Sequence, residues 1–190
     1  MGSGVEGQEM TANERAGKFG EAMGGGDANG GYTAEQVWSS LRLWVAFARA
    51  HSAIAAREQH TLSKYNLTRG EFGVMDALFF KGPLSLSDIQ RKIIVSSSGI
   101  TYLVDRLEKK GMVKRQPAPE DRRSTFAALT DEGEEFFKGI FPKHVIGLAE
   151  VFSDMTNKES ERGMEYFNEI TKRATSLLEK EIAKESEKIG

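Results

Sequence analysis

The residues of this sequence best suited to chemistry are hydroxylated side chains and arginines, and they gather in its middle third. The hydroxylated ones are Ser96, Ser97, Ser98, Thr101 and Tyr102. The arginines are Arg122 and Arg123, which follow Asp121. Hydroxyl and guanidinium groups donate hydrogen bonds to phosphate oxygens and to base edges. This set therefore indicates nucleic-acid recognition and not bond-making chemistry.

The same segment is the basic part of an otherwise acidic chain. The 190 residues include 26 Lys or Arg and 28 Asp or Glu, which gives a formal net charge of −2. Between residues 85 and 123, nine basic residues stand against five acidic ones, a net charge of +4, which leaves −6 for the rest. Phosphate binding is therefore expected at a local patch and not over the whole surface.

The chain offers little for catalysis or for holding a cofactor. It contains no cysteine, which excludes a disulfide framework, a thiolate zinc site and a thiol redox switch. Its histidines, His51, His60 and His144, lack metal-ligand spacing, and none of them lies near a plausible serine and acid in a known nucleophile arrangement. The glycine cluster GGGDANGG lacks the Lys-Ser/Thr of a phosphate loop. We predict no enzyme activity, no catalytic residue, no metal and no cofactor.

The sequence also bears on location. No apolar run is long enough to span a bilayer, and the N-terminus lacks the basic-then-apolar order of a secretory signal. We therefore expect a cytoplasmic protein that makes no membrane contact.

The ends of the chain are expected to be long helices flanking the basic segment. Residues 1–31 are rich in glycine and are predicted to be disordered. Thr33 and Gln36 form a capping box, and apolar residues at helical spacing then continue to about Ser63. A helix of about thirty residues, roughly 45 Å long, projects beyond a small core, so a second chain is the simplest cover for it. Two further helices are predicted, Asp131 to about Phe152, kinked or split at Pro142, and Thr156 to about Ile182.

The middle of the chain has the element order of a winged helix-turn-helix. Helices are predicted after the capping boxes at Thr68 and Ser85, and a third follows with Ser96 as its cap. Two strands, 112–116 and 124–130, then flank a proline-bent loop, with Phe126 and Leu129 as their inward anchors. We predict a mainly α fold with a small β-hairpin wing (α+β), divided into a 1–31 arm, a 32–66 helix, a 67–130 DNA-binding domain and 131–190 helices.

This arrangement gives each polar residue a place on double-stranded DNA. In a helix-turn-helix the second helix enters the major groove with its N-terminal residues at the base edges, where the hydroxylated set falls. Pro117 and Pro119 would hold the loop extended and deliver Arg122 and Arg123 to a minor groove. One of the two arginines could instead be held by Asp105 or Asp121 and so orient the wing.

The segments ITYLVDRLEKKGMVKR and PEDRRSTFAALTDEG resemble the recognition helix, wing and following helix of MarR-type transcriptional regulators, with unbroken spacing over about fifty residues. The resemblance implies a homodimer in which the N- and C-terminal helices intertwine and two wings grip a near-palindromic operator. On the family pattern, Ser96 to Ser98 and Thr101 match base- and phosphate-contacting positions, and Arg123 matches the arginine of D-x-R.

The family resemblance also implies regulation by a ligand. Members commonly repress, and release DNA when a phenolic or other aromatic compound binds between the dimer core and the DNA-binding lobes. The candidate pocket residues are Trp44, Phe47, His51, Phe72 and Met75, with Arg49 a further partner for an anion, although core packing explains the aromatic residues as well. The chain is most similar to the branch that includes repressors of quinone and catechol detoxification, but Ala118 stands where that branch can carry a cysteine.

One alternative function uses the same fold. A winged helix can bind protein instead of DNA, because a fold does not fix a function. A dimer that ignores every duplex at low salt would favour that protein-interaction module.

Overall fold

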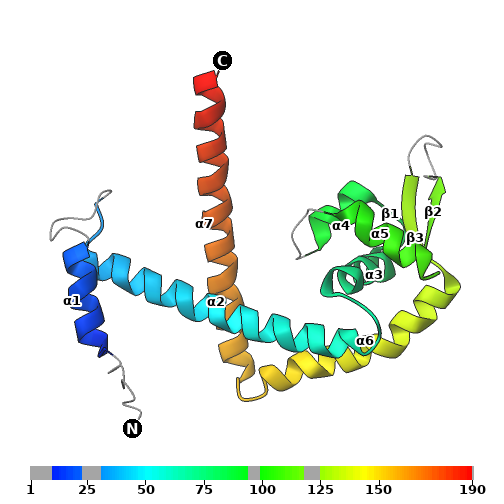
Figure 1. Ribbon diagram of the computed structural model, residues 1–190, viewed down its shortest axis with the longest axis horizontal. Coiled ribbons are helices and arrows are strands. Elements are labelled where there is room, and N and C mark those ends of the chain that lie inside the picture. Colours follow the sequence, from blue (N-terminus) through cyan, green and yellow to red (C-terminus); the bar gives the residue numbers. More distant parts are fainter. Residues whose placement is uncertain (1–9, 23–30, 94–98, 118–124, 190) are drawn as a thin grey trace, which may run out of the picture. The chain divides into compact units, whose positions relative to one another are not determined.

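The computed structural model describes residues 10–22, 31–93, 99–117 and 125–189, and it is mostly helical with one small sheet (Figure 1). The helices are α1 (Ala12–Ala22), α2 (Ala34–Ser63), α3 (Arg69–Lys81), α4 (Leu86–Lys92), α5 (Ile100–Lys109), α6 (Asp131–Val151) and α7 (Asn157–Ile189). The strands are β1 (Leu84–Ser85), β2 (Val113–Pro117) and β3 (Thr125–Leu129). The predicted mainly α fold with a β-hairpin wing is confirmed.

Capping boxes begin three of these helices where the sequence predicts them. The Thr33 N–H donates to Gln36 Oε1 at 2.9 Å, and the Gln36 N–H donates back to the Thr33 hydroxyl at 3.2 Å. Thr68 with Glu71 and Thr156 with Glu159 repeat the reciprocal pattern before α3 and α7. Each box satisfies N–H groups that the first helical turn leaves without partners.

The prediction that residues 1–31 are disordered is wrong for Ala12–Ala22, which form α1. The helix has its own capping box, in which the Thr11 N–H donates to Glu14 Oε2 at 2.7 Å. Its Phe19 ring lies 5.2 Å from the Trp38 ring of α2, centroid to centroid. The glycine-rich composition of the arm favoured disorder, and the apolar contact that supports this helix could not be seen in the arm because it comes from Trp38, outside it. All of the glycine cluster except Gly31 lies outside the described residues.

The winged helix-turn-helix core is built from the end of α2, from α3 to α6 and from the sheet. Its centre consists of apolar residues with no more than 1% of their surface exposed: Leu62, Val74, Met75, Ile89, Val104, Leu107, Ala127 and Phe137. Leu86, Ile93, Ile100 and Leu103 pack partly buried against it. Phe137 and Ile140 of α6 belong to the same cluster, so the core continues past residue 130.

The sheet has three antiparallel strands in the order β1-β3-β2. The register places Leu84 opposite Ala127 and Val113 opposite Leu129. The sequence did not reveal β1, since a two-residue strand shows no alternation. Of the two predicted anchors, Leu129 packs against the core while partly buried, whereas Phe126 is half-buried and does not belong to that cluster; Ala127 and Ala128 are buried. Small side chains suit the central strand, because helices pack closely against it.

Three helices differ from the predictions. Helix α5 begins at Ile100 after Gly99, which has a φ of 121° and makes no side-chain cap; the predicted cap Ser96 lies outside the described residues. Helix α6 was predicted to be kinked or split at Pro142, and it is one continuous helix through that residue, so the split is wrong. Helix α7 runs to Ile189, past the predicted end at Ile182.

The chain divides by its contacts into two compact units, Met1–His60 and Thr61–Gly190. The first contains α1 and most of α2. The second contains the winged helix-turn-helix core and α7. Among the described helices, none is both long and apolar enough to cross a membrane.

Candidate nucleic-acid interface

Helix α5 presents two of the predicted DNA-contacting residues on its outer face. Thr101 and Tyr102 are exposed, Tyr102 with 61% of its surface, whereas Val104 and Leu107 on the inner face are fully buried. This division follows the apolar spacing of the helix. Ser96, Ser97 and Ser98 lie outside the described residues. The side chains of Thr101 and Tyr102 in the N-terminal turn of α5 are therefore accessible from solvent.

Strands β2 and β3 form the antiparallel hairpin predicted for the wing (Figure 1). Their register runs from Val113 opposite Leu129 to Pro117 opposite Thr125. The predicted contact residues Arg122 and Arg123, with Asp121 beside them, lie outside the described residues. Their roles remain predictions.

An ion-pair cluster joins the wing to α5. Arg115 of β2 donates from Nη2 to Asp105 Oδ1 at 2.5 Å and from Nη1 to Glu108 Oε2, and both acids belong to α5. The hydrogen bond that Arg115 donates to Asp105, together with the nearby Glu108, raises the pKa of Arg115, so this guanidinium stays charged. Asp105 was predicted to orient the wing by holding one of its tip arginines. The structure gives it Arg115, which sequence reasoning had not singled out.

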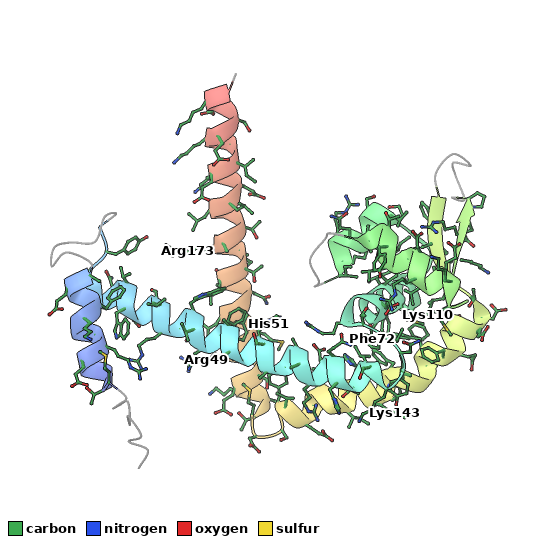
Figure 2. The ribbon with its side chains drawn as sticks, in the orientation of Figure 1. Arg49, His51, Phe72, Lys110, Lys143 and Arg173 are labelled. Carbon is green, nitrogen blue, oxygen red and sulfur yellow. The ribbon has the colours of Figure 1, made fainter. Side chains whose placement is uncertain are left out.

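A second cluster joins the C-terminal half of α5 to the start of α3. Glu71 is fully buried, and its Oε1 accepts from Lys110 Nζ at 2.7 Å and lies 3.2 Å from Arg106 Nε. Figure 2 labels Lys110. Lysines at the C-terminal end of a helix are commonly solvated charges that complement the helix dipole. That holds for Lys109, which is exposed, but not for Lys110, which has 21% of its side chain exposed.

The predicted ligand-pocket residues fall into two groups. Trp44, Phe47 and His51 lie on α2 and are exposed. The Phe47 ring lies between the other two: its centroid is 6.0 Å from that of Trp44 and 6.4 Å from that of His51. Phe72 and Met75 of α3 are buried in the winged-helix core, Met75 completely. The two groups belong to different compact units, and a pocket formed by both remains a prediction.

Arg49 lies elsewhere on α2. It lines an open groove of about 590 Å³ between α1 and α2, together with Arg15, Arg42 and the apolar side chains of Trp38 and Leu41. Figure 2 labels Arg49 and His51 on this helix. The predicted anion partner is therefore one of three arginines around an apolar floor.

One titratable pair escaped sequence reasoning. Burial raises the pKa of Asp76 on α3, and the charge of His144 on α6 offsets only part of that effect. The His144 ring also lies 4.2 Å from the Phe72 ring, centroid to centroid. No helical periodicity marks such a pair, because the two residues belong to different helices. Within the described residues, no cluster of three or more His, Cys, Asp or Glu could hold a metal ion.

The comparison with known proteins agrees with this geometry. Residues 67–125, which span α3 to the start of β3, match the model of the MarR family. The chain is 35% identical over 131 residues to the HTH-type transcriptional regulator MhqR of Bacillus subtilis, covering 69% of this chain and 90% of that protein. This chain belongs to the MarR family. Its relatives are named as transcriptional regulators and not as enzymes.

Solved structures share the fold. Sco3205 of Streptomyces coelicolor, a MarR family regulator crystallised in complex with DNA, aligns with a TM-score of 0.64 at 22% identity over 88% of this chain and 91% of that one. BpsR of Bordetella bronchiseptica, whose DNA binding is regulated by 6-hydroxynicotinic acid, aligns with a TM-score of 0.61 at 21% identity over 66% and 90%. The MarR chain described here is a DNA-binding transcriptional regulator with a winged-helix fold.

Proposed function

We propose that this MarR regulator is a homodimeric repressor that acts in the cytoplasm and binds a near-palindromic operator without catalysing any reaction. The observation that carries the DNA-binding geometry is the exposed N-terminal turn of α5, with Thr101 and Tyr102 on its outer face beside the wing hairpin. A helix of this kind enters a major groove while its buried face stays on the core. The serines before α5 and the wing arginines would extend the contact to phosphates and a minor groove.

Exposed apolar side chains support the homodimer. On α2 they are Leu41, Leu43, Trp44, Val45 and Phe47, and on α7 they are Met164, Tyr166, Phe167, Ile170, Leu177, Leu178 and Ile182. Contiguous apolar surface of this kind marks an interaction site in a soluble protein. A second copy would cover both helices and, by its symmetry, present two recognition helices to one operator.

A small aromatic effector is proposed to release the repressor from DNA. The exposed Trp44, Phe47 and His51 rings of α2 suit an aromatic ligand, and the regulation of BpsR by 6-hydroxynicotinic acid is a precedent in the fold. Phe72 and Met75 remain proposed as its other wall. Because this chain has no cysteine, the signal is proposed to be a reversibly bound phenol, catechol or quinone and not thiol oxidation.

The testing experiment is selection of duplexes from a random pool by the purified protein. We expect a palindrome with half-sites about one helical turn apart, and binding whose logarithm falls linearly with the logarithm of salt concentration. Titrating the selected duplex complex with phenols, catechols and quinones then identifies the effector class by loss of binding. If no duplex is enriched at low salt, a protein-interaction role replaces operator binding.

Single substitutions test the proposed DNA contacts of the recognition helix and of the wing separately. Thr101→Ala and Arg123→Ala are each expected to weaken operator binding while leaving the circular dichroism spectrum unchanged. Lys172→Ala on α7, which removes a positive charge far along the chain from the basic segment, is the matched control. Equal operator affinity for wild type and Arg123→Ala would show that the wing arginine makes no contact.

A further inference from the structure

Glu71 differs from the other capping-box glutamates of this protein. Glu14, Glu71 and Glu159 each cap a helix from its third position, but Glu14 and Glu159 are exposed and Glu71 has none of its surface exposed. Among the described residues, it is the one buried charged side chain. A cap needs no burial, and removing a carboxylate from water carries a desolvation penalty. Capping alone therefore does not explain why the Glu71 side chain is buried.

The two oxygens of Glu71 have separate partners. Oε2 accepts the capping bonds from the Thr68 N–H at 2.8 Å and from the Thr68 hydroxyl at 3.0 Å. Oε1 is left for α5, where Lys110 Nζ lies at 2.7 Å and Arg106 Nε at 3.2 Å. Burial raises the pKa of Glu71, but the hydrogen bonds from Lys110 and Thr68 lower it by more, so the net pKa is below the usual range. The carboxylate is therefore charged and bound at both ends.

Lys110 extends the cluster to a third segment. Its Nζ donates to the Asn66 carbonyl at 2.6 Å, in the turn that joins α2 to α3. Asn66 has a φ of 56°, in the left-handed region that few non-glycine residues adopt. Lys110, the residue that caps the C-terminus of the recognition helix, is thus fixed to both the turn and the start of α3.

Arg106 carries the same cluster toward the DNA-facing surface. Its guanidinium carbon lies 5.7 Å from the centroid of the Tyr102 ring, one helical turn nearer the N-terminus of α5. That separation is within the range of a cation–π interaction. Arg106 is partly exposed and Tyr102 largely so. The sequence of contacts runs from a buried carboxylate to an exposed aromatic side chain.

We propose that Glu71 is a positioning residue for operator recognition: it fixes the orientation of α5 through Lys110 and holds the Tyr102 ring through Arg106. The inference rests on the proposed operator binding. It assigns Glu71 no contact with DNA. Its effect is to reduce the number of arrangements that α5 and Tyr102 sample before they meet the bases, so specific binding depends on it more than non-specific phosphate binding does.

Glu71→Gln is the direct test, because glutamine keeps the size and a capping oxygen but loses the charge. We expect its dissociation constant for the selected operator to rise at least about tenfold, while that for an unrelated duplex at low salt stays within about twofold. Glu159→Gln makes the same change in an exposed box and should alter neither. Arg106→Lys keeps the charge opposite Glu71 but removes the guanidinium plane, so it tests the Tyr102 step in a protein that folds.

Fluorine NMR of protein labelled with 3-fluorotyrosine supplies a readout that capping alone would not move. The Tyr102 signal is assigned by its loss in Tyr102→Phe. It is expected to shift toward that of a free side chain in Glu71→Gln and Arg106→Lys, and to stay in place in Glu159→Gln.

Unchanged operator affinity and an unchanged Tyr102 signal in both Glu71→Gln and Arg106→Lys, with only a lower unfolding temperature in the former, would overturn the inference and leave Glu71 a structural cap. A wild-type protein that selects no duplex would overturn the proposed function and the role in recognition together. The fluorine spectra would still report whether Glu71 holds the ring.

Discussion

At the scale of single residues, Arg115 is the side chain that ties the wing to the recognition helix. Its guanidinium forms ion pairs with both Asp105 and Glu108, which lie three residues apart on one face of α5. Arg115→Ala is expected to lower the free energy of unfolding by about 1 kcal/mol, since all three side chains are partly exposed and such pairs are weak. Operator affinity should fall further than stability does, because the wing loses its orientation.

The Arg115 prediction is checked by urea denaturation and by operator titration. Lys138→Ala is the control, since Lys138 also pairs with two acids, Glu134 and Glu135, but within one helix. A loss of operator affinity that only matches the change in stability would mean that Arg115 supports the fold and does not orient the wing.

Asp76 is expected to make the free energy of unfolding depend on pH, with a sign opposite to that expected for a carboxylate held in an ion pair. Because burial raises its pKa in the folded state, folding favours the protonated form. That contribution is present below the unfolded pKa of about 3.8 and is lost as pH rises through the higher folded value. Asp76→Asn is therefore expected to raise the urea midpoint at pH 7, with the difference from wild type shrinking toward pH 4. A lower midpoint at pH 7 would show that a hydrogen bond to the carboxylate outweighs its burial.

At the scale of elements, the junction between the wing and α6 depends on Gly133. A Cβ there would lie 2.0 Å from the Met112 carbonyl oxygen, a backbone atom that cannot turn aside. The same carbonyl accepts from the Thr130 N–H at 3.1 Å, so it cannot move without breaking that hydrogen bond. Gly133→Ala is expected to destabilise the protein by about 2 kcal/mol or more.

Gly139 in the same helix is the matched control. Nothing lies within 4 Å of a Cβ at this position. Gly139→Ala should therefore stabilise α6 by about 0.5 to 1 kcal/mol through helix propensity. Thermal unfolding of both variants measures the difference, and equal midpoints would contradict the close approach at Gly133.

At the scale of the whole molecule, the apolar residues of α7 are predicted to lie in the interface between two copies. Ile170 and Leu177 are each about half exposed in the single chain. The double variant Ile170→Glu with Leu177→Glu is expected to convert the dimer to a monomer and to abolish operator binding. Sedimentation velocity measures the first effect. Lys180→Glu on the same helix changes the charge by the same amount and should remain dimeric.

Much of this protein was determined by the sequence itself. Capping boxes at Thr33, Thr68 and Thr156, apolar spacing in α5 and the capping threonine Thr130 locate the helices, because these interactions are made within a few residues of chain. The basic segment and the pattern of the family identified a DNA-binding regulator for the same reason. Two elements were missed because sequence patterns report only interactions made within a few residues. Strand β1 is too short to show a pattern, and α1 depends on a contact with Trp38, which lies outside its own segment.

Only the tertiary structure decided which charges act together. The sequence shows Glu71, Arg106 and Lys110 as ordinary surface residues of two helices, and Arg115 as one basic residue among several. Folding brings Glu71 and Lys110, 39 positions apart, to within 2.7 Å and removes the carboxylate from water. Burial and pairing of this kind depend on how α3 packs against α5, and that packing is fixed by the shared core of Val104, Leu107 and Met75 and not by any local motif.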